Sequence, residues 1–263
     1  MNITDLHHER RGAVAWIGFN RPARRNALGD TTTRQLVHLC ADAERDPAVK
    51  VVVITGQGEA FCAGGDIQDT FQRGAAMSEA QWSERIRQGP NALALGIQTM
   101  RKPVIASVNG LAVGGGATIA LACDLRIASD RARFRFPFAQ LGITPEFGCS
   151  YWLQRVVGAG RAMELLLLGE FIDAATAQQH GLVNRVVDHA SLDSATQQWA
   201  SQLAALPSQA VARLKQLMHF ARHHDLPATL EQEALALGQC FTSAEHRAAV
   251  ARFLDRKGSA PAA

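Results

Sequence analysis

The order of buried strands, turns and helices in the first half of the chain constrains its fold most. Three apolar runs rich in β-branched residues cover 14–19, 51–55 and 104–108, and turn residues follow each of them directly. Helical patterns at 31–45 and 78–100 separate these runs. Strands that alternate with helices predict a parallel sheet covered by helices, which is the α/β class.

The second half of the chain is predominantly helical. After a fourth predicted strand at 125–128, Gly169 and Gly181 mark the ends of two helices, and four longer helices follow at 190–205, 208–223, 227–241 and 243–257. The last helices carry apolar residues at helical spacing and therefore need a surface to cover. We expect a core domain over 1–200 and a helical oligomerisation region over 201–263.

Composition narrows the classes of protein. The chain has 263 residues with 47% hydrophobic and 19% charged residues, as expected of a soluble globular protein. Its net charge of +3 is small and its basic residues are scattered, so we expect no nucleic acid partner. Five cysteines without a CxxC motif indicate a reduced, cytoplasmic setting.

One uncharged stretch, residues 103–123, is long enough to span a bilayer. It contains Pro103, Asn109 and a Gly-Gly-Gly run, so we predict a buried strand, a turn and a helix instead and no membrane association.

Two glycine turns each lie between a strand and a helix, in FCAGGDI (61–67) and GLAVGGGATIALACD (110–124). Glycine lets a ligand approach the backbone closely, and the amides at a helix N-terminus point outward without partners. Two such turns facing one another would form an oxyanion hole. Each turn taken singly is also explained as a purely structural turn, with Asp66 capping the segment after the first. The chain contains neither a phosphate-binding loop motif nor a GxGxxG motif.

Glu146 is the only acid between Asp130 and Glu164, and aromatic residues surround it in the sequence. Desolvation there would raise its pKa. Two interpretations stay open on local pattern. In one, Thr144, Pro145 and Glu146 form the N-cap and first turn of a helix. In the other, Glu146 is a catalytic acid/base.

Four segments together, FNRPARRNAL, VVVITGQGEAFCAGGDI, KPVIASVNGLAVGGGATIALACDLRIAS and GRAMELLLLGEFIDAATAQQHGLVNRVV, resemble the enoyl-CoA hydratase/isomerase (crotonase) superfamily. The resemblance covers residues 10–255. It implies a crotonase-like spiral of repeated ββα units, followed by a C-terminal helical trimerisation region that forms a trimer or a dimer of trimers. It implies an acyl-CoA thioester as substrate, whose carbonyl the N–H groups of Gly65 and Gly115 polarise. It implies no metal and no cofactor, since coenzyme A is part of the substrate.

The resemblance also indicates a branch of this superfamily. Hydratases carry two glutamates, and the corresponding positions here hold Thr118 and Phe138, which cannot ionise. Adding water requires more acid/base groups than moving a double bond, which needs one base. FPFAQLGITPEFGCS resembles the branch that isomerises 3-enoyl-CoA to 2-enoyl-CoA with a single glutamate, here Glu146. The alternatives are hydratase, hydrolase or dehalogenase chemistry, or a catalytically reduced module that binds acyl-CoA or RNA.

The resemblance further implies substrate contacts. For coenzyme A and the acyl group these are Arg24, Arg25, Ala63, Asp66, Ile67, Phe138, Phe253 and Lys257. Solvated charge is the alternative for the two arginines, and core packing is the alternative for Phe253. The helix over 78–100 is expected to wall the acyl pocket through Trp82, Ile86, Leu93 and Ile97, which ordinary core packing would also explain. His219 and His223 have helical i, i+4 spacing but lack an HExxH motif, so we expect surface histidines.

Overall fold

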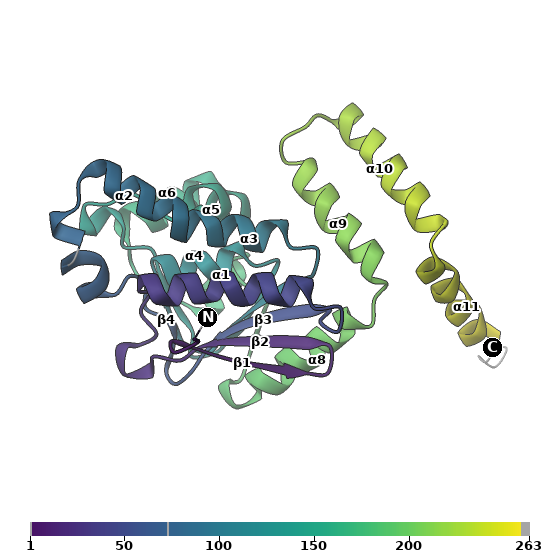
Figure 1. The fold of residues 1–263 in the computed structure, drawn as a ribbon, viewed down its shortest axis with the longest axis horizontal. Coiled ribbons are helices and arrows are strands. Elements are labelled where there is room, and N and C mark those ends of the chain that lie inside the picture. Colours follow the sequence, from purple (N-terminus) through teal and green to yellow (C-terminus); the bar gives the residue numbers. More distant parts are fainter. Residues whose placement is uncertain (1, 73, 259–263) are drawn as a thin grey trace.

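The computed structural model describes residues 2–72 and 74–258 and contains two β-sheets (Figure 1). The larger sheet has the strand order β1-β2-β3-β5-β7-β10, and its strands are β1 (Leu6–Arg11), β2 (Val14–Phe19), β3 (Val51–Gly56), β5 (Val104–Val108), β7 (Leu125–Ser129) and β10 (Arg185–Val187). The smaller sheet has the order β4-β6-β8-β9, with β4 (Ala60–Cys62), β6 (Leu111–Val113), β8 (Arg133–Arg135) and β9 (Ile172–Asp173). The pairs β1–β2 and β8–β9 are antiparallel, and the other pairs are parallel.

From β3 to β8, consecutive strands alternate between the two sheets. The pairs β3/β4, β5/β6 and β7/β8 each give one strand to the larger sheet and the next strand to the smaller one, before the chain enters helices. This repetition confirms the predicted α/β spiral of ββα units. The four predicted strands are present, with β2 and β5 at their predicted bounds.

Helices cover both faces of the larger sheet. The helices of the core are α1 (Asp30–Arg45), α2 (Glu79–Ile86), α3 (Ala92–Thr99), α4 (Gly115–Ala122), α5 (Cys149–Val157), α6 (Ala159–Leu168), α7 (Ala174–Gln179) and α8 (Leu192–Ala204). On one face, Leu36 and Leu39 of α1 join the main apolar core. On the other, Leu192 and Ala200 of α8 pack against Trp16 in a second cluster (Figure 1). A sheet buried on both faces needs near-continuous apolar strands, which is what the sequence contains.

Shorter helical turns connect these elements. The 3-10 turns are η1 (Pro22–Arg24), η3 (Gly74–Ala76), η5 (Ala139–Leu141) and η6 (His189–Ser191), and the π-helical turns are η2 (Ile67–Gln72) and η4 (Arg87–Asn91). The helix predicted over 78–100 begins as α2 at Glu79, with Ser78 as its N-cap, but η4, which contains Pro90, interrupts it. Proline has no N–H to donate, so the regular α-helical bonding fails there.

Residues 103–123 contain β5, β6 and the whole of α4. The predicted buried strand, turn and helix are therefore present, with β6 as an additional short strand. Among the described residues, no helix combines the length and the apolar character needed to cross a membrane.

The last three helices extend away from the core (Figure 1). They are α9 (Ser208–Phe220), α10 (Leu226–Phe241) and α11 (Ala244–Gly258), close to the predicted ranges. Lys215 of α9 is buried and bonds Asp124 Oδ2 at 2.6 Å, which ties this region to the core. The predicted boundary at residue 200 falls inside α8, which packs on the sheet. Many large apolar side chains of α9–α11 are exposed, including Leu214, Leu226, Phe241 and Leu254.

Candidate active site

Glu146 lies in an irregular segment before α5 and is not part of a helix. The helix begins at Cys149 with Gly148 as its N-cap, so the interpretation of Glu146 as a first-turn residue is wrong. The reason is local, because Phe147 and Gly148 both have positive φ angles, 53° and 80°, which a right-handed helix excludes. A bulky residue in this conformation is strained, and such strain concentrates at functional sites.

Gly115 brings a helix N-terminus against this carboxylate. The bond from Thr118 N to the Gly114 carbonyl at 3.0 Å opens α4, so the amide of Gly115 belongs to the unpaired first turn. A Cβ atom at Gly115 would lie 2.9 Å from Oε1 of Glu146 and 2.8 Å from a ring carbon of Phe147. The carboxylate therefore lies directly against the backbone of Gly115.

The turn at Gly64–Gly65 adjoins the turn at Gly114–Gly116. Leu28 N donates to the Gly64 carbonyl at 2.7 Å, and Asp66 N donates to the Leu28 carbonyl at 2.8 Å. Because alternate amides of an extended chain point to opposite sides, the intervening Gly65 N–H points away from Leu28. A Cβ atom at Gly64 would lie 3.7 Å from Gly115 N, which shows how closely the two turns approach.

A cavity of about 680 Å³ lies in front of these groups. Gly65, Glu146, Phe147 and Leu28 line its inner wall. We define the outer wall as the lining residues within 30–34 and 81–90, which come from α1, α2 and η4. Trp82 and Ile86 line the cavity as expected, whereas Leu93 and Ile97 belong to the buried core.

The environment of Glu146 shifts its protonation equilibrium. Burial raises the pKa of Glu146 to about 7, against the opposing positive charge of Arg85 on the outer wall. Burial also raises the pKa values of the neighbouring thiols, to about 12 for Cys62 and about 11 for Cys149. Both thiols stay protonated near neutral pH and act as small packing groups, so the ionisable group beside Gly115 is the glutamate.

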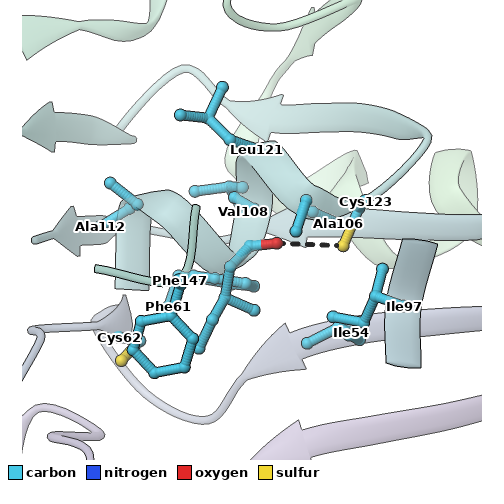
Figure 2. Packing of buried hydrophobic residues seen from close by; sticks show 14 of the residues in the cluster. Ile54, Phe61, Cys62, Ile97, Ala106, Val108, Ala112, Leu121, Cys123 and Phe147 are labelled. Carbon is cyan, nitrogen blue, oxygen red and sulfur yellow. Dashed lines mark hydrogen bonds between the residues drawn. The ribbon is translucent and has the colours of Figure 1, made fainter. Parts of the chain in front are cut away.

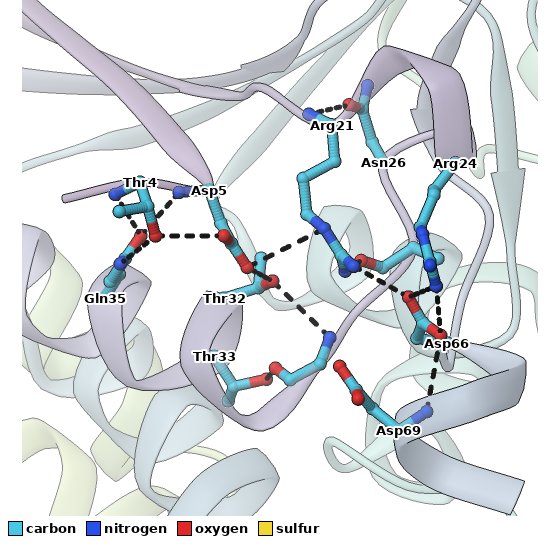
Figure 3. Close-up of polar contacts among 12 residues, drawn as sticks. Thr4, Asp5, Arg21, Arg24, Asn26, Thr32, Thr33, Gln35, Asp66 and Asp69 are labelled. Atoms are coloured by element: carbon cyan, nitrogen blue, oxygen red, sulfur yellow. Dashed lines mark hydrogen bonds and ion pairs between the residues drawn. The ribbon is translucent and has the colours of Figure 1, made fainter. Parts of the chain in front are cut away.

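Asp66 holds the first glycine turn in place (Figure 3). Its side chain is 2% exposed, pairs with Arg21 at 2.9 Å and Arg24 at 3.2 Å, and accepts from Gln68 N at 3.0 Å, which confirms the predicted cap. Burial opposes ionisation, but the hydrogen bonds from the amides of Asp69 and Gln68 and from Arg21 prevail and lower the pKa of Asp66. The carboxylate of Asp66 is enclosed by these partners and is not accessible to a substrate. A substrate contact at Asp66 would therefore have to involve its backbone, and this contact stays a prediction.

The remaining predicted substrate contacts near the turns differ in their exposure and in their bonding partners. Arg24 is partly exposed, with its guanidinium on Asp66 and Gln68. Arg25 is exposed, and its carbonyl accepts from Ala63 N at 3.0 Å, which joins the two segments. Phe138 is buried behind Gly114, where a Cβ atom would lie 3.8 Å from its ring, and the cavity lining does not include it.

Three other predicted contacts are Phe253, Ile67 and Lys257. Phe253 is 59% exposed on α11 and is not among the residues that line the cavity. The side chains of Ile67 and Lys257 lie outside the described residues. These substrate contacts stay predictions.

Neither position that corresponds to a hydratase glutamate can take part in acid/base chemistry. Thr118 is fully buried, and its hydroxyl donates to the Gly114 carbonyl at 3.1 Å. Phe138 is an apolar core residue. Among these three positions, Glu146 is therefore the one with an ionisable side chain, and it lies against Gly115 and lines the cavity together with Gly65.

The described residues contain no cluster of three His, Cys, Asp or Glu side chains suited to a metal ion. The predicted surface histidines contact polar neighbours, His219 at Gln98 and His223 at the Tyr151 hydroxyl.

The site thus combines a spiral α/β fold, two adjoining glycine turns and a carboxylate against Gly115, in one cavity with Gly65. A family model described as enoyl-CoA hydratase/isomerase matches residues 9–260. The chain belongs to the enoyl-CoA hydratase/isomerase family.

Its relatives and structural neighbours span nearly the whole chain. A short-chain-enoyl-CoA hydratase of Clostridium acetobutylicum is 35% identical over 98% of this chain and 97% of its own length. A 1,2-epoxyphenylacetyl-CoA isomerase of Escherichia coli is 35% identical over 96% and 95%. The crystal structure of a protein described as a putative enoyl-CoA hydratase from Streptomyces coelicolor superposes with a TM-score of 0.92 at 31% identity, over 96% of this chain and 92% of that one.

Proposed function

We propose that this protein isomerises 3-enoyl-CoA to 2-enoyl-CoA with Glu146 as its single acid/base group. The observation that carries the proposal is the position of Glu146 Oε1, in contact distance of the Gly115 backbone and in one cavity with Gly65. The burial of Thr118 and Phe138 supports one carboxylate at the turns rather than two.

The proposed reaction moves one proton in two steps. The thioester oxygen accepts from the amides of Gly65 and Gly115, which makes the C2 protons more acidic. Glu146 takes a C2 proton, and the electron pair of the broken C–H bond delocalises through the C3–C4 double bond and the thioester as a dienolate. Protonated Glu146 then returns the proton to C4, and the double bond lies between C2 and C3. Atoms and electrons balance without a further reactant.

The raised pKa suits this shuttle. A carboxyl group with a pKa of about 7 is present in both protonation states near neutral pH, so it accepts and returns a proton with little energetic penalty.

Three further properties are part of the proposal. Five free cysteines support a cytoplasmic location. The exposed apolar residues of α9–α11 support assembly into a trimer or a dimer of trimers. We expect no cofactor besides the coenzyme A of the substrate, since the proposed steps need none.

The test compares wild type, Glu146→Gln and a matched control, Glu84→Gln, in D2O. Glu84 lines the same cavity on the outer wall but bonds Arg87 and Gln88. We expect wild type and Glu84→Gln to convert 3-enoyl-CoA to the conjugated isomer, measured by absorbance and deuterium incorporation, and Glu146→Gln to be at least about a thousandfold slower. Water addition by wild type would indicate hydratase chemistry, and equal rates in wild type and Glu146→Gln would refute the role of Glu146.

The pH dependence provides a second readout. Because the free enzyme needs an ionised base, kcat/KM should fall tenfold per pH unit below a pKa of about 7 and level off above it. A profile that is flat between pH 5 and 9 would exclude Glu146 as the base.

A further inference from the structure

The outer wall of the cavity is more polar than an alkyl chain requires. Pockets for apolar ligands are lined mostly by apolar side chains with few polar groups. Here the outer wall combines Trp82, Ile86 and Pro90 with eight polar or charged residues, namely Asp30, Thr31, Thr33, Arg34, Gln81, Glu84, Arg85 and Gln88. Some of these groups face the space that an acyl group would occupy.

Arg85 is the most enclosed cation of this wall, with a side chain that is 16% exposed. Its Nε donates to Asp30 Oδ1 at 2.8 Å, one Nη to the Asp69 carbonyl at 3.1 Å, and the other Nη contacts Met77 Sδ at 4.0 Å. The guanidinium also stacks over the Trp82 ring, 4.9 Å from its centre. These contacts hold the group in a fixed orientation.

Hydrogen-bonding capacity remains on this guanidinium. A guanidinium carries five N–H donors, and three contacts, one of them to a weakly accepting thioether, leave two N–H groups without an acceptor among the described residues. Donors that are held in place and shielded from bulk water gain most from an acceptor supplied by a ligand.

We propose that Arg85 is a specificity-determining residue, which binds an oxygen acceptor, a hydroxyl or a carboxylate, carried by the acyl group away from its thioester. This inference rests on the proposed function in taking the cavity as the acyl site, and it names the substrate class as oxygenated acyl-CoA rather than plain alkyl-CoA. The inner wall places the thioester and the base, and Arg85 on the outer wall selects the tail.

Binding of unreactive saturated thioesters tests the inference without turnover. We would measure, by calorimetry at pH 8, the dissociation constants of hexanoyl-CoA, 6-hydroxyhexanoyl-CoA and adipoyl-CoA, which share one chain length. Wild type should bind at least one oxygenated thioester about tenfold more tightly than hexanoyl-CoA. In Arg85→Met, which keeps an unbranched, flexible apolar side chain but removes the guanidinium donors, the ratio should fall to about one.

Arg87→Met is the matched control. Arg87 lies two residues further along, pairs with Glu84 and is absent from the cavity lining, so this variant should keep the wild-type preference. Tighter binding of hexanoyl-CoA by wild type, or a preference that survives in Arg85→Met, would overturn the inference.

Asp30→Asn tests the same guanidinium through an expected gain of affinity rather than a loss. A gain of affinity cannot result from misfolding, so this variant keeps the test decisive if Arg85→Met does not fold. The amide oxygen of Asn still accepts from Nε, but the negative charge beside Arg85 is gone. Binding of adipoyl-CoA should therefore tighten severalfold relative to hexanoyl-CoA, and a weakening would contradict the proposal.

The two proposals fail separately. If the binding preference follows Arg85 but no 3-enoyl-CoA is isomerised, only the reaction is wrong. If alkyl 3-enoyl-CoA is isomerised and the preference is absent, only the substrate class is wrong.

Discussion

The two glycine turns have the same proposed task but are held by different forces. The turn at Gly64–Gly65 is fixed by charge, because Asp66 binds Arg21, Arg24 and backbone amides (Figure 3). The turn at Gly114–Gly116 is fixed by packing, because Phe147 lies directly against Gly115 and Cys62 directly against Gly116. Both Phe147 and Cys62 belong to the apolar core (Figure 2).

This difference teaches where each turn tolerates change. Close packing resists added volume, and the penalty does not depend on pH. A Cβ atom at Gly65 would make only ordinary contacts with its nearest neighbours, but a charge network depends on the ionisation of its members. A steric change, an electrostatic change and the removal of a single hydroxyl should therefore affect the stability of the two turns differently.

Gly115→Ala should have the largest effect. The new Cβ would lie under 3 Å from both Phe147 and Glu146, so the strained loop and the base must both move. We expect kcat/KM of the proposed reaction to fall at least about a thousandfold, since loss of one oxyanion donor alone costs 10²–10³. Rates with 3-enoyl-CoA and thermal unfolding of the same preparations measure the two consequences.

Gly65→Ala is the contrasting variant. The three atoms nearest to its Cβ would all belong to Thr70, at 3.4–3.5 Å, which is ordinary contact. We expect its unfolding free energy to stay within about 0.5 kcal/mol of wild type. Equal destabilisation of the two alanine variants would contradict the distinction between a packed turn and a charge-held turn.

Asp66→Asn should have the next largest effect, on stability. The substitution weakens the bonds from Arg21 and from the amides, and we expect a loss of about 2 kcal/mol in unfolding free energy by denaturant titration. Arg24→Gln removes a partner whose side chain is 47% exposed, so it should cost below about 1 kcal/mol. A larger loss in Arg24→Gln than in Asp66→Asn would show that the solvent-facing pair dominates.

The pH dependence of this loss has a defined sign. The pKa of Asp66 is lowered in the folded protein, so its ionised form stabilises the fold above the unfolded pKa of about 3.9. The difference in unfolding free energy between wild type and Asp66→Asn should be constant from pH 8 to 5 and shrink as the pH falls below about 4. A difference that grows on acidification would contradict the assignment.

The sequence predicted the buried strands better than the edges. Residues 14–19 and 104–108 are continuous apolar runs, and such runs specify central strands locally. The edge strand β1 contains His7, His8 and Glu9, and its pattern carries no apolar signal. The short strands of the second sheet were also missed, because strands of two or three residues are defined by their partners rather than by their own sequence.

The parts of the site that could be predicted are those with a signal in the neighbouring sequence. Glu146 and the glycine turns were found from isolated charge and turn composition, but the helix start at Thr144 was not confirmed, because the positive φ of Phe147 depends on packing against Gly115. Arg85 was missed, since one arginine on an amphipathic helix has no distinctive pattern. Its role depends on Asp30 and Asp69, which the fold brings from 55 and 16 residues away.

Thr118→Val should have the smallest effect. It tests whether packing alone holds the turn at Gly114–Gly116. Valine keeps the shape of the buried side chain and removes the hydroxyl that donates to the Gly114 carbonyl, so we expect a loss of about 1 kcal/mol in stability. The hydroxyl is fully enclosed and has no access to a substrate, so the isomerisation rate should stay within about twofold of wild type. Calorimetric unfolding and the 3-enoyl-CoA assay, run on one preparation, separate these effects. If the rate instead fell a hundredfold while the fold stayed intact, the Gly114–Gly116 turn would depend on a polar contact as the other turn does, and packing alone would not explain how the oxygen-binding amide of Gly115 is held.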